Sequence, residues 1–330
     1  MSKPILNAVL CANQKFFPGL ASALASAVYS ASGNFDYHFH VISDEITNRQ
    51  LDALRKELIY LSRKVHNNQI QVEISRPNFD FDKLNSLPKR RGSRMTFAKF
   101  LIPEIFPHLD SVVYMDSDVL YLKGIEQLVL NENEPYLIAG VTDYIRFLKN
   151  DCPWKSSLNA NELPLPYVNA GVLWMNLHRL RKGNFSESAI RLRSAEKGMR
   201  KGDQPVWNYL CRGKVKVLSE SLNFTTSLGS CASLMKNWSA CNIHYIGPEK
   251  PWQVSHKTHK IFAETIWHQF VQSVIPSLEL SKMILPLEEA HDYHTTLIKS
   301  YLYRLINPKR AFYYKKAVSS HNLRAKSFTF

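Results

Sequence analysis

The chain has 330 residues, of which 45% are hydrophobic and 21% charged, so it can form one large or two ordinary domains with a substantial core. This composition excludes a disordered chain, and no apolar run approaches the ~20 residues that a membrane-spanning helix needs. Five cysteines without a C-x-x-C spacing argue against a zinc ribbon and a disulfide framework, and they favour a reducing, cytoplasmic environment.

The positive charge is concentrated near the C-terminus. The formal net charge is +14, and no acidic residue follows Asp292. The segment after Asp292 carries eight cations interleaved with tyrosines and phenylalanines, so more than half of the net charge lies in this segment. The cations are Lys299, Arg304, Lys309, Arg310, Lys315, Lys316, Arg324 and Lys326.

Strand and helix patterns alternate along the first quarter of the chain. Alternating or short apolar runs predict strands, and apolar residues spaced three or four apart predict helices. Strands separated by helices form mainly parallel sheets covered on both faces, so we expect an α/β fold. The predicted strands are residues 7–12, 37–43 and 69–74, and the predicted helices are residues 20–31 and 47–62.

The same patterns continue through the rest of the chain. Residues 79–93 and 151–166 lack periodicity and predict loops, the second of them on the substrate side. Ligands of parallel sheets bind beyond the carboxyl ends of the strands, where we expect the functional residues. The predicted strands are residues 112–115, 119–122, 135–141, 167–177, 214–218 and 242–245, and the predicted helices are residues 95–106, 185–195, 203–211 and 256–274.

Two carboxylates interrupt a buried strand pattern. Asp116 and Asp118 separate two apolar runs, and at this spacing in an extended chain both side chains point to the same face. A buried carboxylate is normally paired or bound to a metal, and two oxygen ligands suit a divalent cation. The alternative is two acids that end the strand and form local salt bridges. The pattern alone is not specific, because Asp80 and Asp82 form another D-x-D in a predicted loop.

A second motif lies more than a hundred residues downstream of the two carboxylates. Residues 244–252 read H-x-x-G-x-x-K-P-W. A lone histidine at a strand end is more often structural than a ligand. With two carboxylates, however, His244 would complete a set that suits Mn²⁺ or Mg²⁺ better than zinc, which favours nitrogen and sulfur. Lys250 could then place a positive charge beside a metal-bound diphosphate.

These motifs resemble those of glycosyltransferase family eight, retaining enzymes that include bacterial lipopolysaccharide galactosyl- and glucosyltransferases. The resemblance covers roughly residues 5–275. It implies a GT-A, Rossmann-like nucleotide-diphospho-sugar transferase domain over residues 1–275, followed by a helical basic tail over residues 276–330. The matching elements are, in order, Asp116 with Asp118, the N-A-G-V-L run at 169–173, the pair Asp203 and Gln204, and residues 244–252.

The resemblance also implies the reaction and its cofactors. The enzyme would move galactose or glucose from a UDP-sugar to a lipopolysaccharide core or similar membrane glycan, with Mn²⁺ or alternatively Mg²⁺ bound. In this family the departing phosphate oxygen is thought to serve as the base, so no carboxylate pair needs to flank the reacting bond. The sequence agrees, because Gln204 is a poor nucleophile and no second acid lies near Asp203.

Individual roles follow from the resemblance as well. Asp116, Asp118 and His244 would bind the metal that bridges the diphosphate. Asn13 replaces the usual aspartate of the uridine loop, so it can accept a hydrogen bond but brings no charge. The expected donor-binding residues are Ala12, Asn13, Lys99 (usually arginine in the family), Asp116, Ser117, Asp118, Gly247 and Lys250. The expected catalytic and sugar-contacting residues are Asp143, Asn169, Asp203 and Gln204.

Two other classes of function compete with this interpretation. A nucleotidyltransferase on a related sheet shares acidic metal sites, but it usually has a glycine-rich loop after the first strand, and residues 10–16 lack glycines. A non-catalytic basic adaptor would not need Asp116, Asp118, His244 and Lys250 together.

The C-terminal segment predicts membrane attachment. Leu297, Ile298, Tyr301, Leu302 and Leu305 fall on one helical face among cations, a pattern typical of interfacial anchors. We expect a cytoplasmic protein held on the cytoplasmic face of the inner membrane by anionic lipid. A solvated basic tail is the alternative. Single-stranded nucleic acid ranks lower as a partner, because no recognised nucleic-acid motif accompanies the aromatic residues.

Overall fold

The computed structural model describes residues 3–67, 69–90, 92–143, 166–196, 202–225, 241–247, 250–254, 262–278 and 285–286. The predicted basic tail from residue 293 onward and residues 151–165 of the second predicted loop lie outside the described residues. Within the described residues, no helix combines the length and the apolarity that crossing a membrane requires.

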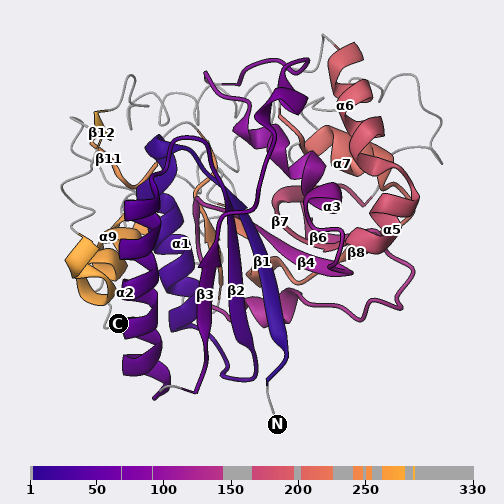
Figure 1. Ribbon diagram of the computed structural model, residues 1–330. Helices are drawn as coiled ribbons and strands as arrows, with labels where there is room; N and C mark the ends of the chain where they lie inside the picture. The colour runs from indigo at the N-terminus through magenta and orange to yellow at the C-terminus, as the bar shows by residue number, and fades with distance from the viewer. Residues whose placement is uncertain are drawn as a thin grey trace, which may run out of the picture.

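A seven-stranded sheet forms the centre of the described structure, in the order β3-β2-β1-β4-β7-β6-β8 (Figure 1). Neighbouring strands pair in parallel except at β7, which is antiparallel to both β4 and β6. The expected mainly parallel sheet is therefore confirmed. The strands are β1 (Ile5–Cys11), β2 (Asp36–Ile42), β3 (Val72–Ser75), β4 (Ser111–Asp116), β6 (Ile138–Thr142), β7 (Val168–Asn176) and β8 (Val215–Val217).

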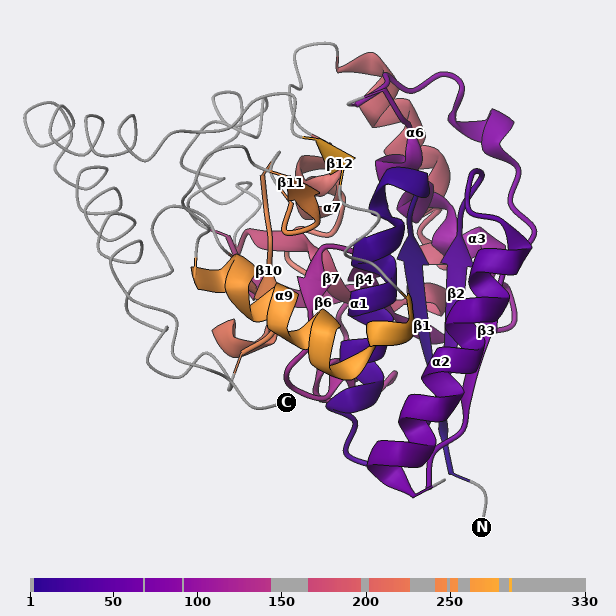
Figure 2. The same cartoon turned by 90° about the vertical axis from the view of Figure 1, so that its left-hand side faces the viewer.

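Helices cover both faces of the sheet (Figures 1 and 2). Side chains that alternate along β1 enter two separate core clusters, with Leu10 on one face and Val9 on the other. The Leu10 cluster includes side chains of α1 (Phe17–Tyr29), α2 (Asn48–His66) and α9 (Phe262–Val274). The Val9 cluster includes side chains of α3 (Ile102–Ile105), α5 (Leu177–Lys182), α6 (Phe185–Ala195), α7 (Gln204–Leu210) and the 3₁₀ helix η3 (Met95–Leu101).

Helix α1 is almost entirely buried, because it packs on the sheet and also contacts α2 and α9. Its small side chains permit this close packing. A Cβ atom on Gly19 would lie 2.3 Å from the Trp252 ring and 2.4 Å from the backbone oxygen of Ser117. Further along α1, Ser22 accepts a 2.8 Å hydrogen bond from the indole nitrogen of Trp267. Helix α1 therefore contacts both the turn between Asp116 and Asp118 and Trp252 of the H-x-x-G-x-x-K-P-W motif.

Two local predictions differ from the structure. Residues 95–106 form mainly the 3₁₀ helix η3, followed by the single α-turn α3, rather than one continuous α-helix. Pro103 explains the break, because it has no N–H to donate to the carbonyl of Lys99, and Ile102 donates to that carbonyl instead. The short strands β9 (Phe224–Thr225), β11 (Gln253–Val254) and β12 (Leu285–Pro286) were not predicted.

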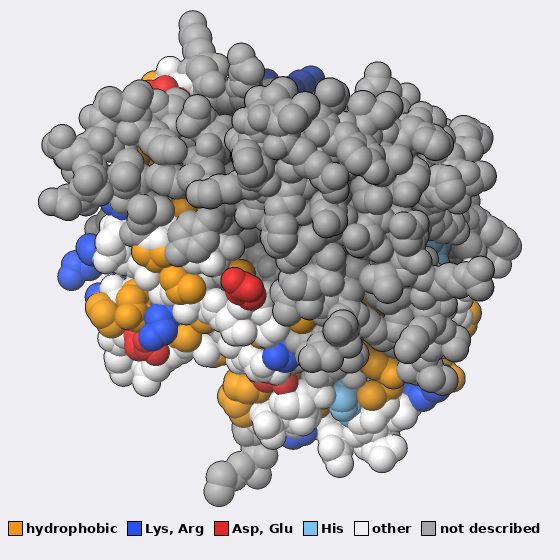
Figure 3. Space-filling model, turned by 180° about the vertical axis from the view of Figure 1, so that it is seen from behind, with side chains coloured by type: hydrophobic (Ala, Val, Ile, Leu, Met, Phe, Trp, Pro, Cys, Tyr) orange, Lys and Arg blue, Asp and Glu red, His pale blue; other side chains and the backbone are white. Residues whose placement is uncertain are grey.

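Large apolar side chains are scattered over the described surface rather than gathered in one patch. Side chains of different kinds are interspersed over the described part of the face seen from behind (Figure 3). The exposed large apolar side chains are Ile5, Val129 and Val217, in three different parts of the chain, and Tyr60 and Val65, both on α2. The candidate functional site in the described structure is therefore the pocket at the edge of the sheet.

Candidate active site

A pocket of about 440 Å³ opens at the carboxyl ends of β1 and β4. Because β7 runs in the opposite direction, its first residues reach the same edge of the sheet, where Met115 pairs with Val172. The predicted site residues that line this central pocket are Ala12, Asn13, Lys99, Asp116, Ser117, Asp118, Asn169, Asp203, Gln204, His244, Gly247 and Lys250. Asp143 lies behind the wall, in contact with two of them.

A small second sheet brings His244 to the two carboxylates. Asp116 ends β4, a turn follows, and β5 (Val119–Leu120) pairs antiparallel with β10 (Ile243–His244). In this register His244 faces Val119, directly after Asp118. The amide of Tyr245 donates to the carbonyl of Asp118 at 2.8 Å. The predicted carboxylate–imidazole cluster is therefore held by backbone hydrogen bonds.

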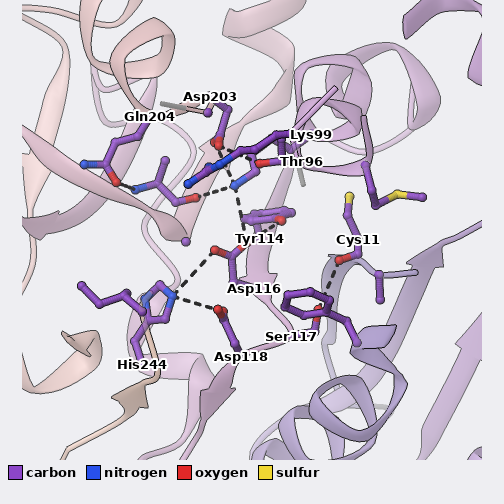
Figure 4. A pocket seen from close by; sticks show the side chains of 18 of the residues that line it. Cys11, Thr96, Lys99, Tyr114, Asp116, Ser117, Asp118, Asp203, Gln204 and His244 are labelled. Atoms are coloured by element: carbon purple, nitrogen blue, oxygen red, sulfur yellow. Dashed lines mark hydrogen bonds and ion pairs between the residues drawn. The ribbon is translucent and has the colours of Figure 1, made fainter. Parts of the chain in front are cut away.

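Asp116, Asp118 and His244 form a group whose ligand atoms lie within 4.8 Å of one another (Figure 4). The imidazole Nε2 lies 3.2 Å from Asp118 Oδ1 and 3.8 Å from Asp116 Oδ2. Gly171 leaves room for this arrangement, because a Cβ there would lie 2.3 Å from the imidazole and 2.6 Å from the Asp116 carboxylate. Two carboxylate oxygens and one imidazole fit Mn²⁺ or Mg²⁺.

Asn223 determines which nitrogen of His244 faces the carboxylates. Its Oδ1 lies 2.9 Å from His244 Nδ1, and its Nδ2 donates to Asn169 Oδ1 at 3.0 Å. An amide that donates on one side must accept on the other, so Nδ1 of the neutral imidazole carries the proton. The lone pair of Nε2 then faces Asp116 and Asp118, as metal binding requires.

The hydrogen-bond chain continues from Asn169 through Asp143 to Gln204, two residues that the family resemblance assigns to the reaction. Asn169 donates to Asp143 Oδ2 at 3.2 Å, and Gln204 Nε2 donates to the same oxygen at 3.3 Å. The amide N–H of Ala170 donates to Gln204 Oε1 at 3.2 Å. Asp143 therefore orients the amides of both Asn169 and Gln204, although it does not line the pocket itself.

Lys99 lies between two pocket carboxylates. Its ammonium is 2.9 Å from Asp203 Oδ2 and 3.4 Å from Asp116 Oδ1, and it donates to the carbonyl of Ala170 at 3.0 Å. Only 2% of the residue is exposed. Thr96 and Tyr114 complete the cluster by donating to Asp203 Oδ1 and Asp116 Oδ1, at 3.0 Å and 2.7 Å. Lys99 thus balances negative charge at the site, a role that the sequence did not predict.

Lys250 is buried and pairs with Asp118 Oδ2, and it also donates to the carbonyl of Tyr245 at 2.6 Å. Gly247, three residues before this lysine, has φ of +110°, a conformation that favours glycine. The last residue of the motif has a packing role. The Trp252 indole donates to the carbonyl of Lys15 at 3.1 Å, and its ring lies edge-on to Phe16.

The two carboxylates differ in their electrostatic surroundings. Burial raises the pKa of Asp116, and the charge of Asp118 adds to this effect against Lys99 and His244. Burial also acts on Asp118, but Lys250 and His244 outweigh it and lower the pKa of Asp118 below its ordinary value. A divalent cation beside Asp116 would favour its ionised form, so the donor set fits a metal electrostatically as well.

The loop after β1 forms another wall of the pocket. The side-chain oxygen of Asn13 is buried and has no hydrogen-bond partner among the described residues. Ser117 donates to the carbonyl of Cys11 at 3.2 Å, so its hydroxyl ties the carboxylate turn to β1. Burial raises the pKa of Cys11 to about 12, so its thiol is protonated at neutral pH and is a poor nucleophile.

The second D-x-D has a local role. Asp80 caps the short 3₁₀ helix η2 (Phe81–Leu84) by accepting a 3.0 Å hydrogen bond from the amide of Asp82, and both residues are exposed. Among the pocket-lining residues, sequence reasoning missed Arg90, Thr96 and Tyr114. It also missed Asn223 behind the pocket. None of them belongs to a motif, so only their position in the fold reveals them.

Sequence comparison identifies the family of this chain and several similar proteins. The family model of glycosyl transferase family 8 matches residues 7–255. The chain is 27% identical to lipopolysaccharide 1,3-galactosyltransferase of Salmonella typhimurium over 254 residues, which are 73% of this chain and 71% of that protein. It is 25% identical to lipopolysaccharide 1,2-glucosyltransferase of Escherichia coli over 258 residues, which are 75% of this chain and 72% of that protein.

Other relatives share a smaller part of their length with this chain. Matches to proteins of Haemophilus influenzae and Streptococcus pneumoniae cover 49% and 53% of those proteins, so the chain spans about half of each.

A solved structure shares the fold. The crystal structure of the galactosyltransferase LgtC, in complex with donor and acceptor sugar analogs, superposes with a TM-score of 0.62 at 21% identity. The superposition covers 82% of this chain and 96% of that chain. The central sheet with helices on both faces is therefore a GT-A fold, which confirms the expected fold class.

Proposed function

The chain belongs to glycosyltransferase family 8, and from that premise we propose that it transfers galactose or glucose, with retention, from a UDP-sugar. The proposed acceptor is a lipopolysaccharide core or a similar membrane glycan. The names of the Salmonella typhimurium and Escherichia coli relatives support this choice of sugar and acceptor. The single observation that carries the proposal is the cluster of Asp116, Asp118 and His244 in the central pocket.

The cluster supports metal-dependent transfer. Asp116, Asp118 and the Nε2 atom of His244 would hold Mn²⁺, or Mg²⁺ as the alternative. A bound ion of this kind supplies Lewis-acid stabilisation for the charge on the departing UDP. Lys250, already beside Asp118, lies where its ammonium can reach an anionic diphosphate.

The loop after β1 supports a uracil nucleotide. The buried Oδ1 of Asn13 lacks a partner among the described residues, and the N3–H group of uracil is a donor that would satisfy it. A cytosine base has no hydrogen on N3. Asn13 can therefore still select uracil without the negative charge of an aspartate.

The state of the pocket carboxylates supports a mechanism without a carboxylate nucleophile, in which the departing phosphate oxygen serves as the base. Each of the three that line the pocket already has a cationic or hydroxyl partner, so none is available as an unpaired nucleophile. The pairs are Asp116 with Lys99 and Tyr114, Asp118 with Lys250 and His244, and Asp203 with Lys99 and Thr96. Gln204 is held by Asp143 and Ala170, which fixes a neutral amide at the wall of the pocket.

We also propose that the segment from residue 276 attaches the enzyme to the cytoplasmic face of the inner membrane. Its basic and aromatic sequence supports this location, and most of it lies outside the described residues. The division at residue 275 remains a prediction.

A panel of UDP-sugars tests the proposed function. Purified protein is incubated with Mn²⁺ and each UDP-hexose in turn, and the slow release of UDP without an acceptor is measured. We expect release from UDP-galactose or UDP-glucose that EDTA abolishes and Mn²⁺ restores. Release of pyrophosphate from a nucleoside triphosphate, with none from any UDP-sugar, would instead identify a nucleotidyltransferase.

A further inference from the structure

Three cationic side chains of Lys and Arg residues line the central pocket in the part of the chain that the structure describes, and their surroundings differ. Lys99 is paired with Asp116 and Asp203, and Lys250 is paired with Asp118. Arg90 has no ion pair with any described acidic residue. Because the pocket carboxylates already have partners, a negative charge for Arg90 has to come from outside the described residues.

Arg90 lies beside Gly202, in the wall of the pocket that also holds Asp203. A Cβ atom on Gly202 would lie 2.2 Å from Arg90 Nη1 and 3.6 Å from Thr96 Oγ1, so the guanidinium lies directly over this glycine. Gly202 immediately precedes Asp203 and Gln204, which the family resemblance assigns to the sugar. The guanidinium therefore borders the sugar end of the pocket.

Two backbone hydrogen bonds join Arg90 to Ser93. Its amide donates to the carbonyl of Ser93 at 2.7 Å, and the amide of Ser93 donates back at 3.1 Å. Gly92 within this turn has φ of +82°, which favours glycine. The guanidinium of Arg94 anchors the same loop through a 2.6 Å hydrogen bond to the carbonyl of Leu87. Arg90 is thus tied to Ser93 through its backbone.

Another arginine, Arg193, is buried near Arg90. Burial lowers the pKa of Arg193, and the positive charge of Arg90 lowers it further. Arg193 packs with its guanidinium 5.3 Å from the centre of the Phe97 ring. The charge of Arg90 is thus felt by a neighbouring arginine, and Arg90 itself brings positive charge to this wall of the pocket.

We propose that Arg90 binds an anionic substituent, a carboxylate or a phosphate, on a sugar at the Asp203 end of the pocket. The inference rests on the proposed glycosyl transfer and adds a charged substrate class to it. The planar guanidinium matches the paired oxygens of either group. If Arg90 bound the donor diphosphate instead, Arg90→Gln would weaken the binding of charged and neutral UDP-sugars alike. The charged sugar is either the acceptor, as a sugar phosphate, or the donor, as a hexuronic acid, and the second outcome would replace galactose or glucose as the proposed donor sugar.

Matched pairs of probes separate the two sources. The donor pair is UDP-galactose and UDP-galacturonic acid, which differ at C6 alone. The acceptor pair is glucose and glucose 6-phosphate, titrated into protein saturated with UDP and Mn²⁺. Affinities are measured by calorimetry for the wild type, for Arg90→Gln, and for the control Lys89→Gln, which removes the same charge from an exposed neighbour that does not line the pocket.

We expect Arg90→Gln to weaken binding of one charged probe by about tenfold, the loss typical of a charge-assisted hydrogen bond, and to leave its neutral counterpart within about twofold. A response of the donor pair identifies a charged donor, and a response of the acceptor pair identifies a charged acceptor. Lys89→Gln should change neither pair. The inference is overturned if Arg90→Gln affects charged and neutral probes equally or affects none. Failure of the wild type to bind any UDP-sugar would instead contradict the proposed function.

Discussion

Asp118 illustrates how several partners determine what one carboxylate can do. Lys250 pairs with one of its oxygens, and His244 lies 3.2 Å from the other. The D-x-D at Asp80 and Asp82 has the same residues at the same spacing, but it is exposed and caps a 3₁₀ turn. The difference arises entirely from what the fold brings to each pair.

Replacing Asp118 by Asn should lower Mn²⁺-dependent release of UDP by more than about 100-fold. Loss of a residue that only hydrogen-bonds to a metal ligand already lowers metal affinity or activity by about 10- to 100-fold, and Asp118 would be a ligand itself. The fold should be retained, as judged by circular dichroism. The melting temperature should fall, because Lys250 loses its buried partner. The additional change Lys250→Met should recover the melting temperature without recovering activity.

Asp80→Asn is the matched control for this variant. Asn is as good a helix cap as Asp, so both activity and melting temperature should stay unchanged. Full Mn²⁺-dependent activity in Asp118→Asn would contradict the metal assignment.

Asn223 forms a hydrogen bond with His244, a proposed metal ligand, although it does not line the pocket. Asn223→Ala removes the acceptor for His244 Nδ1–H and frees the imidazole to change tautomer. We expect the Mn²⁺ concentration that gives half-maximal activity to rise by about 10- to 100-fold. The rate at saturating Mn²⁺ should be much closer to that of the wild type.

Exposed Asn34 provides a control, and Asn34→Ala should leave the Mn²⁺ titration unchanged. A lower rate at every Mn²⁺ concentration, with an unaltered midpoint, would show that Asn223 acts on something other than metal affinity.

At the scale of the elements, the site depends on close contacts between strands and helices that are distant in sequence. The reversed strand β7 brings Asn169 and Gly171 beside Asp116, and the pairing of β5 with β10 delivers His244. Helix α1 supports both through Gly19, where Trp252 and the turn at Ser117 approach its backbone. These contacts leave little space for an added methyl group.

Gly19→Ala should lower the free energy of unfolding by ~1–3 kcal/mol, as overpacking typically does, and it should also reduce activity. The reason is that one neighbour is the backbone oxygen of Ser117, which cannot rotate away. Denaturant unfolding and the UDP-release assay measure the two effects.

Gly183→Ala is the matched control for Gly19→Ala. It has φ of −88°, and an added Cβ would make ordinary contacts at 3.5 Å and 3.7 Å. Gly183→Ala should leave the free energy of unfolding unchanged or raise it slightly, because it reduces the entropy of the unfolded chain. An equal loss at both glycines would show that crowding does not explain the loss at Gly19.

At the scale of the whole molecule, positive charge is distributed between the pocket and the C-terminal segment. In the pocket, Lys99 and Lys250 neutralise carboxylates, and Arg90 remains for a charged sugar in the proposal above. The eight cations after Asp292 belong to a segment outside the described residues. An enzyme that modifies a membrane glycan would benefit from attachment near its acceptor.

Deleting residues 293–330 should release the protein from vesicles that contain anionic lipid, because each Lys or Arg near such a surface contributes ~1 kcal/mol to attachment. Co-sedimentation measures the binding, and neutral vesicles serve as the control. Hydrolysis of the UDP-sugar should be preserved. Unchanged sedimentation with anionic vesicles would refute the proposed anchor.

The periodic elements and the short motifs could be predicted from the sequence alone. Strands β1 and β2 and helix α2 lie close to their predicted bounds, because alternating or helical apolar spacing reports directly on burial. Asp116, Asp118, His244 and Lys250 stood out since carboxylates and a histidine within apolar strands need partners. These local signals predicted an α/β fold and the candidate members of the metal cluster, and the family resemblance added the GT-A fold and the proposed roles.

Only the tertiary structure decided which partners these residues have. The direction of β7, the hydrogen bond from His244 to Asn223 and the ion pairs of Lys99 depend on strand register and on contacts across tens of residues. No local pattern encodes such contacts, because the energy of a buried charge or amide depends on what lies within a few ångströms of it. Arg90 shows the same principle, since its unpaired charge became visible when the partners of every other charged residue in the described pocket were known.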